Sequence, residues 1–312
     1  MVTTSVPLFV SSGDLLADRR YRWAIEQAQH GDLAAAADIL AQTVELAPAF
    51  ATAWFALAAI RDVTGDRAGA ITAFAAARDA DPQDYHGARL HLARLGAGEA
   101  TPDMTATYVR RLFDQHAGEF DAKMREHLAY RGPEVLREAV RAQCGGRMRF
   151  GTMLDLGCGT GLGGAAFRPY VDWLVGVDLS QAMIGEARAK GLYDRLLAGE
   201  LGEFLRDEAA NESRYHLVLG ADVFVYCGNL APIAAAVARV LAEGGLFAFS
   251  VETHDGEGVL LRETLRYAHA ADHVRAALQG AGLAVLSLDA AATRTEKGAP
   301  VTGLIAVVRR EA

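Results

Sequence analysis

The chain has 312 residues, of which 51% are hydrophobic and 22% charged, with a formal net charge of −8 and a pI of about 5.6. This composition is that of a globular protein long enough for two domains, and its acidity argues against broad binding to a nucleic-acid backbone. No apolar run approaches the length of a membrane-spanning helix and the segment from Met1 to Leu16 lacks a basic start, so we expect neither a membrane association nor a signal peptide. Cys144, Cys158 and Cys227 are too far apart for a Cys-x-x-Cys site, which favours a reducing, cytoplasmic location.

The first third of the chain contains a repeat. Two signatures recur with the same spacing, Gly31-Asp32 as Gly65-Asp66 and Pro48 as Pro82, and this spacing is the tetratricopeptide period. One unit also carries the aromatic and small residues of that repeat, at Trp54, Leu57, Ala58, Ala70, Phe74, Ala77 and Pro82. The pattern predicts an all-α tetratricopeptide-repeat domain over residues 1–100, with five or six helices between Asp14 and Leu95, and such a domain can bind a protein partner.

A Gly- and Pro-containing stretch, Gly96 to Pro102, is the predicted linker. The second domain is therefore expected over residues 101–312. Its first part, Thr105 to Arg147, has apolar stripes at helical spacing and predicts helices.

A glycine turn follows the strand predicted over Phe150 to Leu156. Gly157, Gly159 and Gly161 alternate, which permits positive φ and leaves no Cβ between the backbone and a ligand. A helix is expected next, at Ala165 to Tyr170. Strand, glycine turn and helix together predict a nucleotide-type binding site.

Two cofactors suit the turn on spacing alone, because Gly159, Gly161 and Gly164 also satisfy the G-x-G-x-x-G pattern of dinucleotide enzymes. A second strand, Trp173 to Val177, ends at Asp178, which could bind the ribose hydroxyls of either cofactor. Asp155 favours S-adenosylmethionine, because a carboxylate suits an ammonium and a sulfonium better than a pyrophosphate.

Leu154-Asp-Leu-Gly-Cys-Gly-Thr-Gly161 and Val175-Gly-Val-Asp-Leu-Ser180 resemble the motifs of class I S-adenosylmethionine-dependent methyltransferases. The resemblance implies a Rossmann-like α/β fold with a seven-stranded, mostly parallel, doubly wound sheet, and leading helices that cover the cofactor. Tyr108 to Asp121 and Leu128 to Pro133 are similar to segments of a bacterial family of predicted methyltransferases that carry tetratricopeptide repeats.

The rest of the chain alternates between strand and helix patterns, as a parallel sheet requires. The predicted strands cover residues 195–198, 216–219, 246–251, 284–288 and 304–308, the last two as a hairpin that contributes one antiparallel strand. The predicted helices cover residues 181–190, 201–209, 231–241 and 270–278.

Candidate site residues are read at the carboxyl ends of the strands, where ligands of doubly wound sheets bind. The predicted cofactor-binding residues are Asp155, Gly157, Cys158, Gly159, Gly161, Asp178, Leu179, Met183, Gly199, Glu200, Leu201, Ala221 and Asp222. The candidate acceptor-side catalytic residues are Tyr226, His254, Tyr267 and His269, and the sequence suggests no metal site.

These features predict a methyltransferase that uses S-adenosylmethionine and acts on a small molecule or a protein side chain. DNA is disfavoured as the acceptor, because none of the eight prolines is followed by the Pro or Cys of DNA methyltransferase motifs. Two alternatives stay open: a non-catalytic adaptor that binds S-adenosylmethionine or S-adenosylhomocysteine, and an NAD-dependent oxidoreductase.

Overall fold

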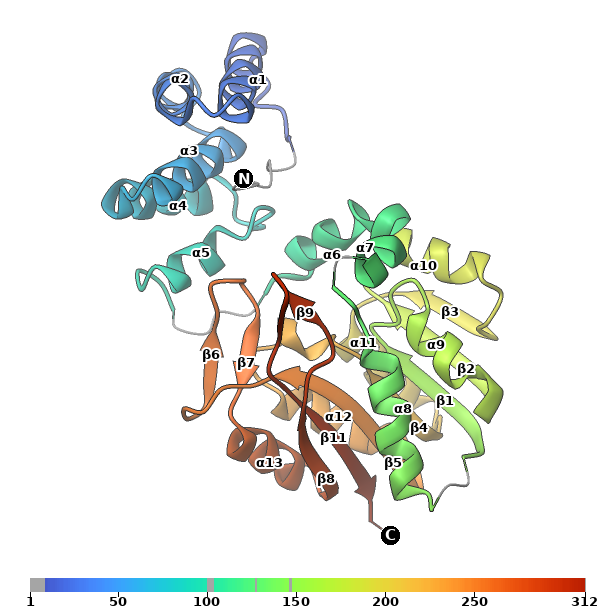
Figure 1. Ribbon diagram of the computed structural model, residues 1–312. Helices are drawn as coiled ribbons and strands as arrows, with labels where there is room; N and C mark the ends of the chain where they lie inside the picture. Colours follow the sequence, from blue (N-terminus) through green and yellow to red (C-terminus); the bar gives the residue numbers. More distant parts are fainter. Residues whose placement is uncertain (1–8, 100–103, 127, 146–147, 312) are drawn as a thin grey trace. The chain divides into compact units, whose positions relative to one another are not determined.

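A computed structural model describes residues 9–99, 104–126, 128–145 and 148–311 (Figure 1). The chain divides into two compact units, Met1–Tyr108 and Val109–Ala312. The boundary predicted at Thr101 and residues 100–102 of the predicted linker lie outside the described residues.

Five helices lie between Asp14 and Leu95 of the first unit, within the predicted number of five or six. They are α1 (Leu15–Gln29), α2 (Leu33–Leu46), α3 (Ala51–Val63), α4 (Arg67–Ala80) and α5 (Ala88–Arg94). Helix α1 packs on α2 and α3 on α4, and the short connections within each pair are those of antiparallel helical hairpins.

The sequence repeat of the first unit is also a repeat of structure. Gly31 and Gly65 both adopt positive φ, and the aspartates that follow them cap the next helix in the same way. Asp32 accepts a hydrogen bond from the Ala35 amide at 3.0 Å, and Asp66 accepts one from the Gly69 amide at 2.9 Å. The second helix of each hairpin therefore starts from an equivalent cap, one sequence period apart, whereas the tetratricopeptide assignment itself stays a prediction.

Alanines and a few large side chains form the core of the first unit. Leu57 and Phe74 are buried, as expected of residues that fill the seam between helices. Trp54 is only partly buried, and its indole N–H donates to the Pro48 carbonyl at 2.9 Å. Small residues such as Ala36 and Ala53, both fully buried, let the helices approach closely.

Helices lead into the second unit, as predicted for residues 105–147, of which 127, 146 and 147 lie outside the described residues. They are α6 (Ala106–Asp114), the 3-10 turn η1 (Ala117–Glu119), α7 (Phe120–Glu126) and α8 (Gly132–Gln143). Helix α8 buries Leu136 and Val140 against the sheet.

The second unit contains the seven strands that the sequence predicts. They are β1 (Phe150–Leu156), β2 (Val171–Asp178), β3 (Arg195–Ala198), β4 (Tyr215–Gly220), β5 (Leu241–Glu252), β8 (Leu283–Ala291) and β11 (Gly303–Arg310). Their order is β3-β2-β1-β4-β5-β11-β8, in which β11 is antiparallel to both of its neighbours and the other pairs are parallel. The mostly parallel, Rossmann-like sheet is confirmed.

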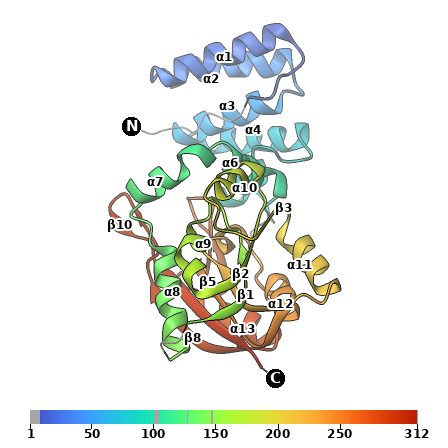
Figure 2. The same ribbon diagram turned by 90° about the vertical axis from the view of Figure 1, so that its right-hand side faces the viewer.

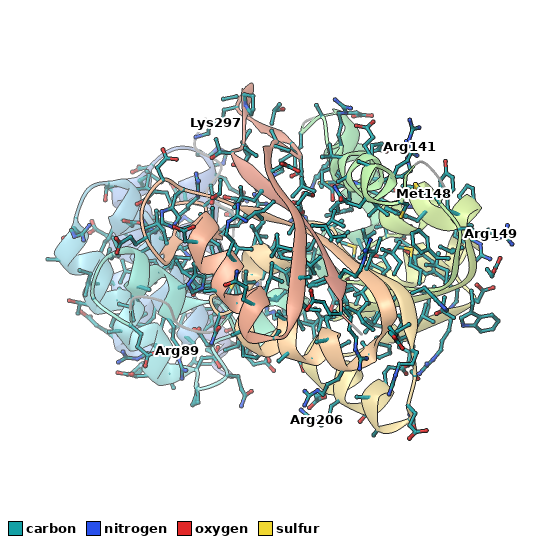
Figure 3. The ribbon with its side chains drawn as sticks, turned by 90° about the horizontal axis from the view of Figure 1, so that it is seen from below. Arg89, Arg141, Met148, Arg149, Arg206 and Lys297 are labelled. Carbon is teal, nitrogen blue, oxygen red and sulfur yellow. The ribbon has the colours of Figure 1, made fainter. Side chains whose placement is uncertain are left out.

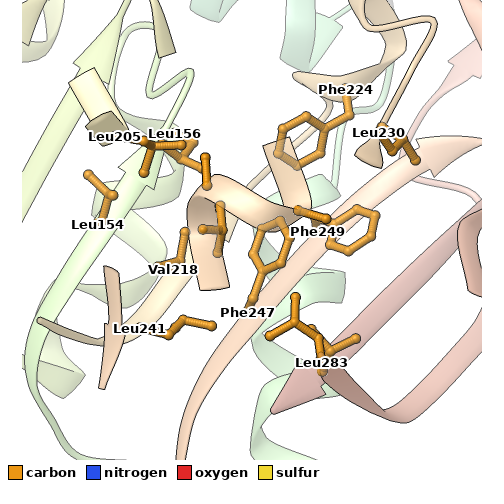
Figure 4. Close-up of a cluster of buried hydrophobic side chains, with 14 of the residues drawn as sticks. Leu154, Leu156, Leu205, Val218, Phe224, Leu230, Leu241, Phe247, Phe249 and Leu283 are labelled. Carbon is orange, nitrogen blue, oxygen red and sulfur yellow. The ribbon is translucent and has the colours of Figure 1, made fainter. Parts of the chain in front are cut away.

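Helices cover both faces of this sheet. The connecting helices are α9 (Leu162–Phe167, continued by the 3-10 turn η2, Arg168–Tyr170), α10 (Gln181–Ala189), α11 (Leu201–Ala210), α12 (Ala231–Val240) and α13 (Ala271–Gly280). Figure 2 shows α8 and α9 on one side of the sheet and α11 and α12 on the other. Each face has its own apolar cluster, and Figure 4 shows the one that joins β1, β4 and β5 to α11 around Phe247 and Phe249.

Two short hairpins were not predicted. Strands β6 (Val259–Leu261) and β7 (Tyr267–His269) pair with each other, and β7 adds to β5 where Glu252 faces Ala268, so the sheet has nine strands where seven were expected. Strands β9 (Thr295–Glu296) and β10 (Ala299–Pro300) form the second hairpin, with Lys297 at its tip (Figure 3). Strands this short cannot show an alternating pattern.

Candidate functional site

The glycine turn joins β1 to α9 at the carboxyl end of the sheet. Gly157, Gly159 and Gly161 all have positive φ, at 63°, 52° and 93°. The turn is anchored to β2, because the Cys158 amide donates to the Val177 carbonyl at 3.0 Å. Helix α9 begins at Leu162, earlier than the predicted Ala165, because Gly161 already provides the left-handed turn that precedes the helix.

Tyr193, between α10 and β3, packs beneath this turn and was not predicted. A Cβ at Gly161, Gly164 or Gly176 would lie 3.0, 2.5 or 2.7 Å from the Tyr193 ring. The Tyr193 hydroxyl accepts from the Gly164 amide at 3.1 Å and donates to Asp155 Oδ2 at 2.7 Å. These three glycines therefore make room for a tyrosine.

Asp155 lies at the end of β1 and is buried. Burial and, to a lesser extent, the Asp178 carboxylate raise the pKa of this carboxyl to about 7, against the lowering effects of the Tyr193 hydroxyl and the Gly164 amide. In the described part of the chain, no lysine or arginine forms an ion pair with Asp155. Over the ranges that the structure describes, the end of β1 thus holds a carboxyl group without a compensating cation.

Asp178 is the last residue of β2, and its carboxylate bonds to both the glycine turn and the loop between β2 and α10. Its Oδ2 accepts from the Gly159 amide at 2.9 Å and its Oδ1 from the Ser180 amide at 2.8 Å. Burial raises the pKa of Asp178 although these amides lower it. The pKa of the buried Cys158 thiol is also raised, by burial and by the Asp155 and Asp178 carboxylates, so this part of the turn disfavours additional negative charge.

The predicted cofactor-binding residues after β2 and β3 lie in the loops that follow these strands or in the helices α10 and α11. Glu200 caps α11, accepting from the Gly202 and Glu203 amides at 2.9 and 2.8 Å. The Gly199 amide donates to the Asp178 carbonyl at 2.9 Å, and Leu201 begins α11. On α10, Met183 is fully buried, whereas Leu179 accepts from Arg110 Nε at 3.3 Å through its carbonyl.

Asp222 follows Ala221 at the end of β4 and has a left-handed φ of 53°. Its Oδ1 accepts from Ser250 Oγ at 2.8 Å and from Thr293 Oγ1 at 3.1 Å. Its amide donates back to Ser250 Oγ at 2.8 Å. Asp222 is therefore joined to β5 and to the segment before β9, and neither partner was identified from the sequence.

The four candidate catalytic residues have different surroundings. Tyr226, in the 3-10 turn η3 (Phe224–Tyr226), makes an edge contact with Phe113 at 5.4 Å between ring centres and hydrogen-bonds to Arg266. Tyr267 and His269 are fully buried in β7. Burial and the neighbouring His273 ring lower the pKa of His269 to about 4. His254 is partly exposed, and its Nδ1 accepts from the Gly256 amide at 3.1 Å.

A cluster of charged side chains that sequence reasoning missed lies at the end of β5. Glu252, which is 3% exposed, pairs with Arg294 and lies 3.3 Å from Arg262 Nε. Arg266 and Arg294 both pair with Glu296, and Arg294 Nη1 lies 3.8 Å from Asp222 Oδ2. The β6–β7 and β9–β10 hairpins supply or flank these arginines, so hairpins that the sequence did not reveal build this edge of the site.

Polar contacts join helices α6 and α7 to the glycine turn and to both ends of α10. Asp114 accepts hydrogen bonds from Ser180 Oγ and the Ala182 amide. Asp121 accepts one from Thr160 Oγ1 in the glycine turn and pairs with Lys190 at 2.6 Å. These contacts agree with the expected cover over the glycine turn.

Among the residues that the structure describes, no group of three or more His, Cys, Asp and Glu side chains could hold a metal ion. Within the same residues, no helix combines the length and apolar character needed to cross a bilayer.

The second unit is similar to known methyltransferases in sequence and in fold. A family described as "Methyltransferase domain" matches residues 154–247. Human methyltransferase-like protein 27 is 28% identical over 194 residues, covering 61% of this chain and 73% of that protein.

Two solved structures share the fold. Burkholderia thailandensis 1,6-didemethyltoxoflavin-N1-methyltransferase has a TM-score of 0.51 at 18% identity, covering 65% of this chain and 88% of that one. The [4+2]-cyclase SpnF has a TM-score of 0.53 at 15% identity, covering 68% and 98%. At these identities the structures establish the fold alone, and residues 154–247 are similar in sequence to the methyltransferase-domain family.

Proposed function

We propose that this chain transfers a methyl group from S-adenosylmethionine to a small molecule or to a protein side chain. The observation that carries the proposal is the buried Asp155, whose pKa is raised to about 7 beside a second buried carboxylate, Asp178. A site of this kind is stabilised by a cationic ligand. S-adenosylmethionine carries an ammonium and a sulfonium, whereas a dinucleotide would bring the two negative charges of its pyrophosphate.

The glycine turn and the ends of β2 to β4 supply the binding groups in this proposal. Each Asp178 oxygen already accepts one amide and has a further lone pair for a ribose hydroxyl. Gly157, Cys158, Gly159 and Gly161 form the turn that would hold the cofactor, and Leu179, Met183, Gly199, Glu200 and Leu201 would hold its adenine. Ala221 and Asp222, at the end of β4, would hold the end of the cofactor that carries the methyl group.

The proposed reaction is an in-line displacement that depends on close approach and alignment. S-adenosylmethionine, when bound, supplies an electrophilic methyl group. The chain orients the acceptor, and α6 and α7 exclude water from the turn. An acceptor that must lose a proton needs a base. His254 is the more accessible candidate for that role, because His269 is fully buried. Tyr226 and Tyr267 are proposed to line the acceptor side.

The N-terminal helices are proposed to be tetratricopeptide repeats that bind a protein partner or a substrate. Their equivalent caps at Asp32 and Asp66 support this assignment. The cytoplasmic location stays a prediction, as does the absence of DNA from the acceptors.

Calorimetric titration of the full chain with S-adenosylmethionine, S-adenosylhomocysteine and NADH tests the cofactor. We expect both sulfur compounds to bind and NADH not to bind. Release of S-adenosylhomocysteine is then measured across amine, hydroxyl, carboxyl and thiol acceptors. Binding without turnover for every class would favour the adaptor, and tight binding of NADH alone would favour the oxidoreductase.

A further inference from the structure

A short irregular segment of the first unit, residues 9–12, lies against the helices that follow it. The chain turns from this segment into α1 at Gly13, whose φ is 81°. Phe9, at the far end of the segment, contacts Tyr21 in the second turn of α1, with 5.4 Å between the ring centres. Segment 9–12 therefore doubles back along α1 instead of extending away from it.

The Phe9 ring is held by two aromatic rings and a cation. Its centre lies 6.2 Å from that of Phe50 in an edge contact, and Tyr21 and Phe50 also contact each other, at 5.5 Å. The Arg22 guanidinium lies 5.2 Å from the centre of the Phe9 ring. Tyr21 and Phe50 are buried, whereas Phe9 is 38% exposed. Aromatic and cation–π contacts both stabilise a bound ring, so this part of the first unit forms a site for one aromatic side chain.

Thr52, in α3, binds the main chain of the segment. Its hydroxyl accepts from the Val10 amide and donates to the Val10 carbonyl, both at 3.3 Å, and lies 3.1 Å from His86 Nε2. A hydroxyl has one donor and two acceptor positions, and all three are filled when His86 Nε2 carries the proton. The Val10 side chain itself is exposed. These bonds therefore recognise a peptide backbone and leave the side chain at this position unrestricted.

Asp18, in α1, binds the two serines at the end of the segment. Its buried carboxylate accepts from Ser11 Oγ at 2.6 Å, from Ser12 Oγ at 2.7 Å and from the Ser12 amide at 2.8 Å. Hydrogen bonds of this kind offset the cost of burying a carboxylate. Asp18 thus favours hydroxyl side chains two and three places after the aromatic residue.

The contacts that hold segment 9–12 have the components of a peptide-binding site. Recognition of a short peptide combines main-chain hydrogen bonds with places for particular side chains, and here Thr52 supplies the first while Tyr21, Phe50 and Asp18 supply the second. The residues of the site belong to α1 and α3 or cap them, so they come from both helical hairpins. The segment lies outside the helices, and its departure breaks no bond within them.

We propose that the surface formed by Asp18, Tyr21, Arg22, Phe50 and Thr52 binds a peptide segment of a partner protein, and that segment 9–12 is an internal competitor for it. The partner segment carries an aromatic residue followed two and three places later by serine or threonine. The inference rests on the proposal that the N-terminal helices bind a partner. A short tether gives the internal segment an effective concentration in the millimolar range, which a partner must overcome.

Fluorescence anisotropy of a labelled peptide with the sequence of residues 9–13 tests this on the full chain. With an effective concentration of about 1 mM and a peptide Kd of about 100 µM, segment 9–12 weakens peptide binding to the wild type by about tenfold. Phe9→Ala weakens the competitor, so the peptide should bind this variant at least about fivefold more tightly than the wild type. A peptide with alanine in place of phenylalanine should bind at least about tenfold more weakly.

Further variants locate the site and control for folding. In the Phe9→Ala background, Arg22→Ala should weaken the peptide about threefold, and Thr52→Val about fivefold or more through loss of the main-chain bonds. Leu15→Ala, at a side chain that is 82% exposed at the start of α1, is the matched control and should bind the peptide as the wild type does. Val10→Pro removes the amide that donates to Thr52 and gives the same test if Phe9→Ala does not fold.

Equal affinity of the peptide for the wild type and for folded Phe9→Ala would overturn the inference, because the segment would then not compete. Absence of binding to Phe9→Ala at millimolar peptide would also overturn it. Wild-type dimers that dissociate in Phe9→Ala would do the same, since the segment would then belong to a second copy of the chain. Titration of the wild type with S-adenosylmethionine is a separate measurement, and its failure refutes the proposed methyl transfer without changing the peptide result.

Discussion

Binding of S-adenosylmethionine should release a proton from Asp155. The Asp155 pKa of about 7 means that roughly half of this carboxyl is protonated at pH 7 in the free protein. A cation within about 4–6 Å lowers such a pKa by about 1–3 units, so we take about 5 for the complex. The complex is then almost fully ionised, and binding releases about 0.5 proton at pH 7 and about 0.8 at pH 6. Because the ionised form binds better, affinity should rise about 40-fold between pH 5 and pH 7.5.

Calorimetric titration in buffers with different enthalpies of ionisation measures this proton directly. Asp155→Asn should bind without proton release. Tyr193→Phe removes a hydrogen bond that lowers the Asp155 pKa, so its affinity profile should move to higher pH. A wild-type binding enthalpy that is the same in all buffers at pH 6 and pH 7 would refute the reasoning, since Asp155 would then have the same protonation in both states.

Three further predictions concern single side chains. Asp178→Ala should weaken S-adenosylhomocysteine binding by about a hundredfold or more, through the loss of hydrogen bonds to a charged group, and calorimetry on the folded variant measures this. Gly164→Ala should lower the free energy of unfolding by about 2 kcal/mol, because its methyl group would meet the Tyr193 ring at 2.5 Å. Its control Gly185→Ala, in α10 with nothing within 4 Å, should raise it by about 0.5–1 kcal/mol in the same urea titration. Glu252→Gln should lower the free energy of unfolding by about 1.5–3 kcal/mol, because it removes a buried charge-assisted hydrogen bond from Arg294, which keeps its pair with Glu296 and its longer contact with Asp222, and a thermal transition equal to that of the wild type would contradict this.

Most of the fold was predictable because the long elements bury one face. The strands of the sheet are runs of Val, Leu and Phe, and the caps at Asp32 and Asp66 recur in the sequence itself. The error at α9 is local: Gly161 ends the turn, and the two glycines after Leu162 gave no helical signal although they are helical. Short hairpins such as β6–β7 depend on pairing with β5 and leave no periodic pattern.

The site was predictable only where the glycine turn and the strand ends indicate it. Asp155 and Asp178 flank the turn in sequence and in space. The sequence does not show what lies around them, because the partners come from distant segments. Tyr193 contacts Gly164 across 29 residues. Thr293 contacts Asp222 across 71 residues, and neither residue type signals a ligand site by itself.

The hydrogen bonds that join the connection between α7 and α8 to the segment around the start of β9, from Thr295 to the Leu128 carbonyl and from the Arg131 amide to the Thr293 carbonyl, also set an order of assembly. Thr295 and Leu128 are 167 residues apart, so this connection cannot be fastened until synthesis has passed Thr295. The glycine turn and its aspartates lie much earlier in the chain, and the strands that carry them precede β5. During synthesis, a nascent chain should therefore form the turn before the connection between α7 and α8 can bond to the segment that begins β9.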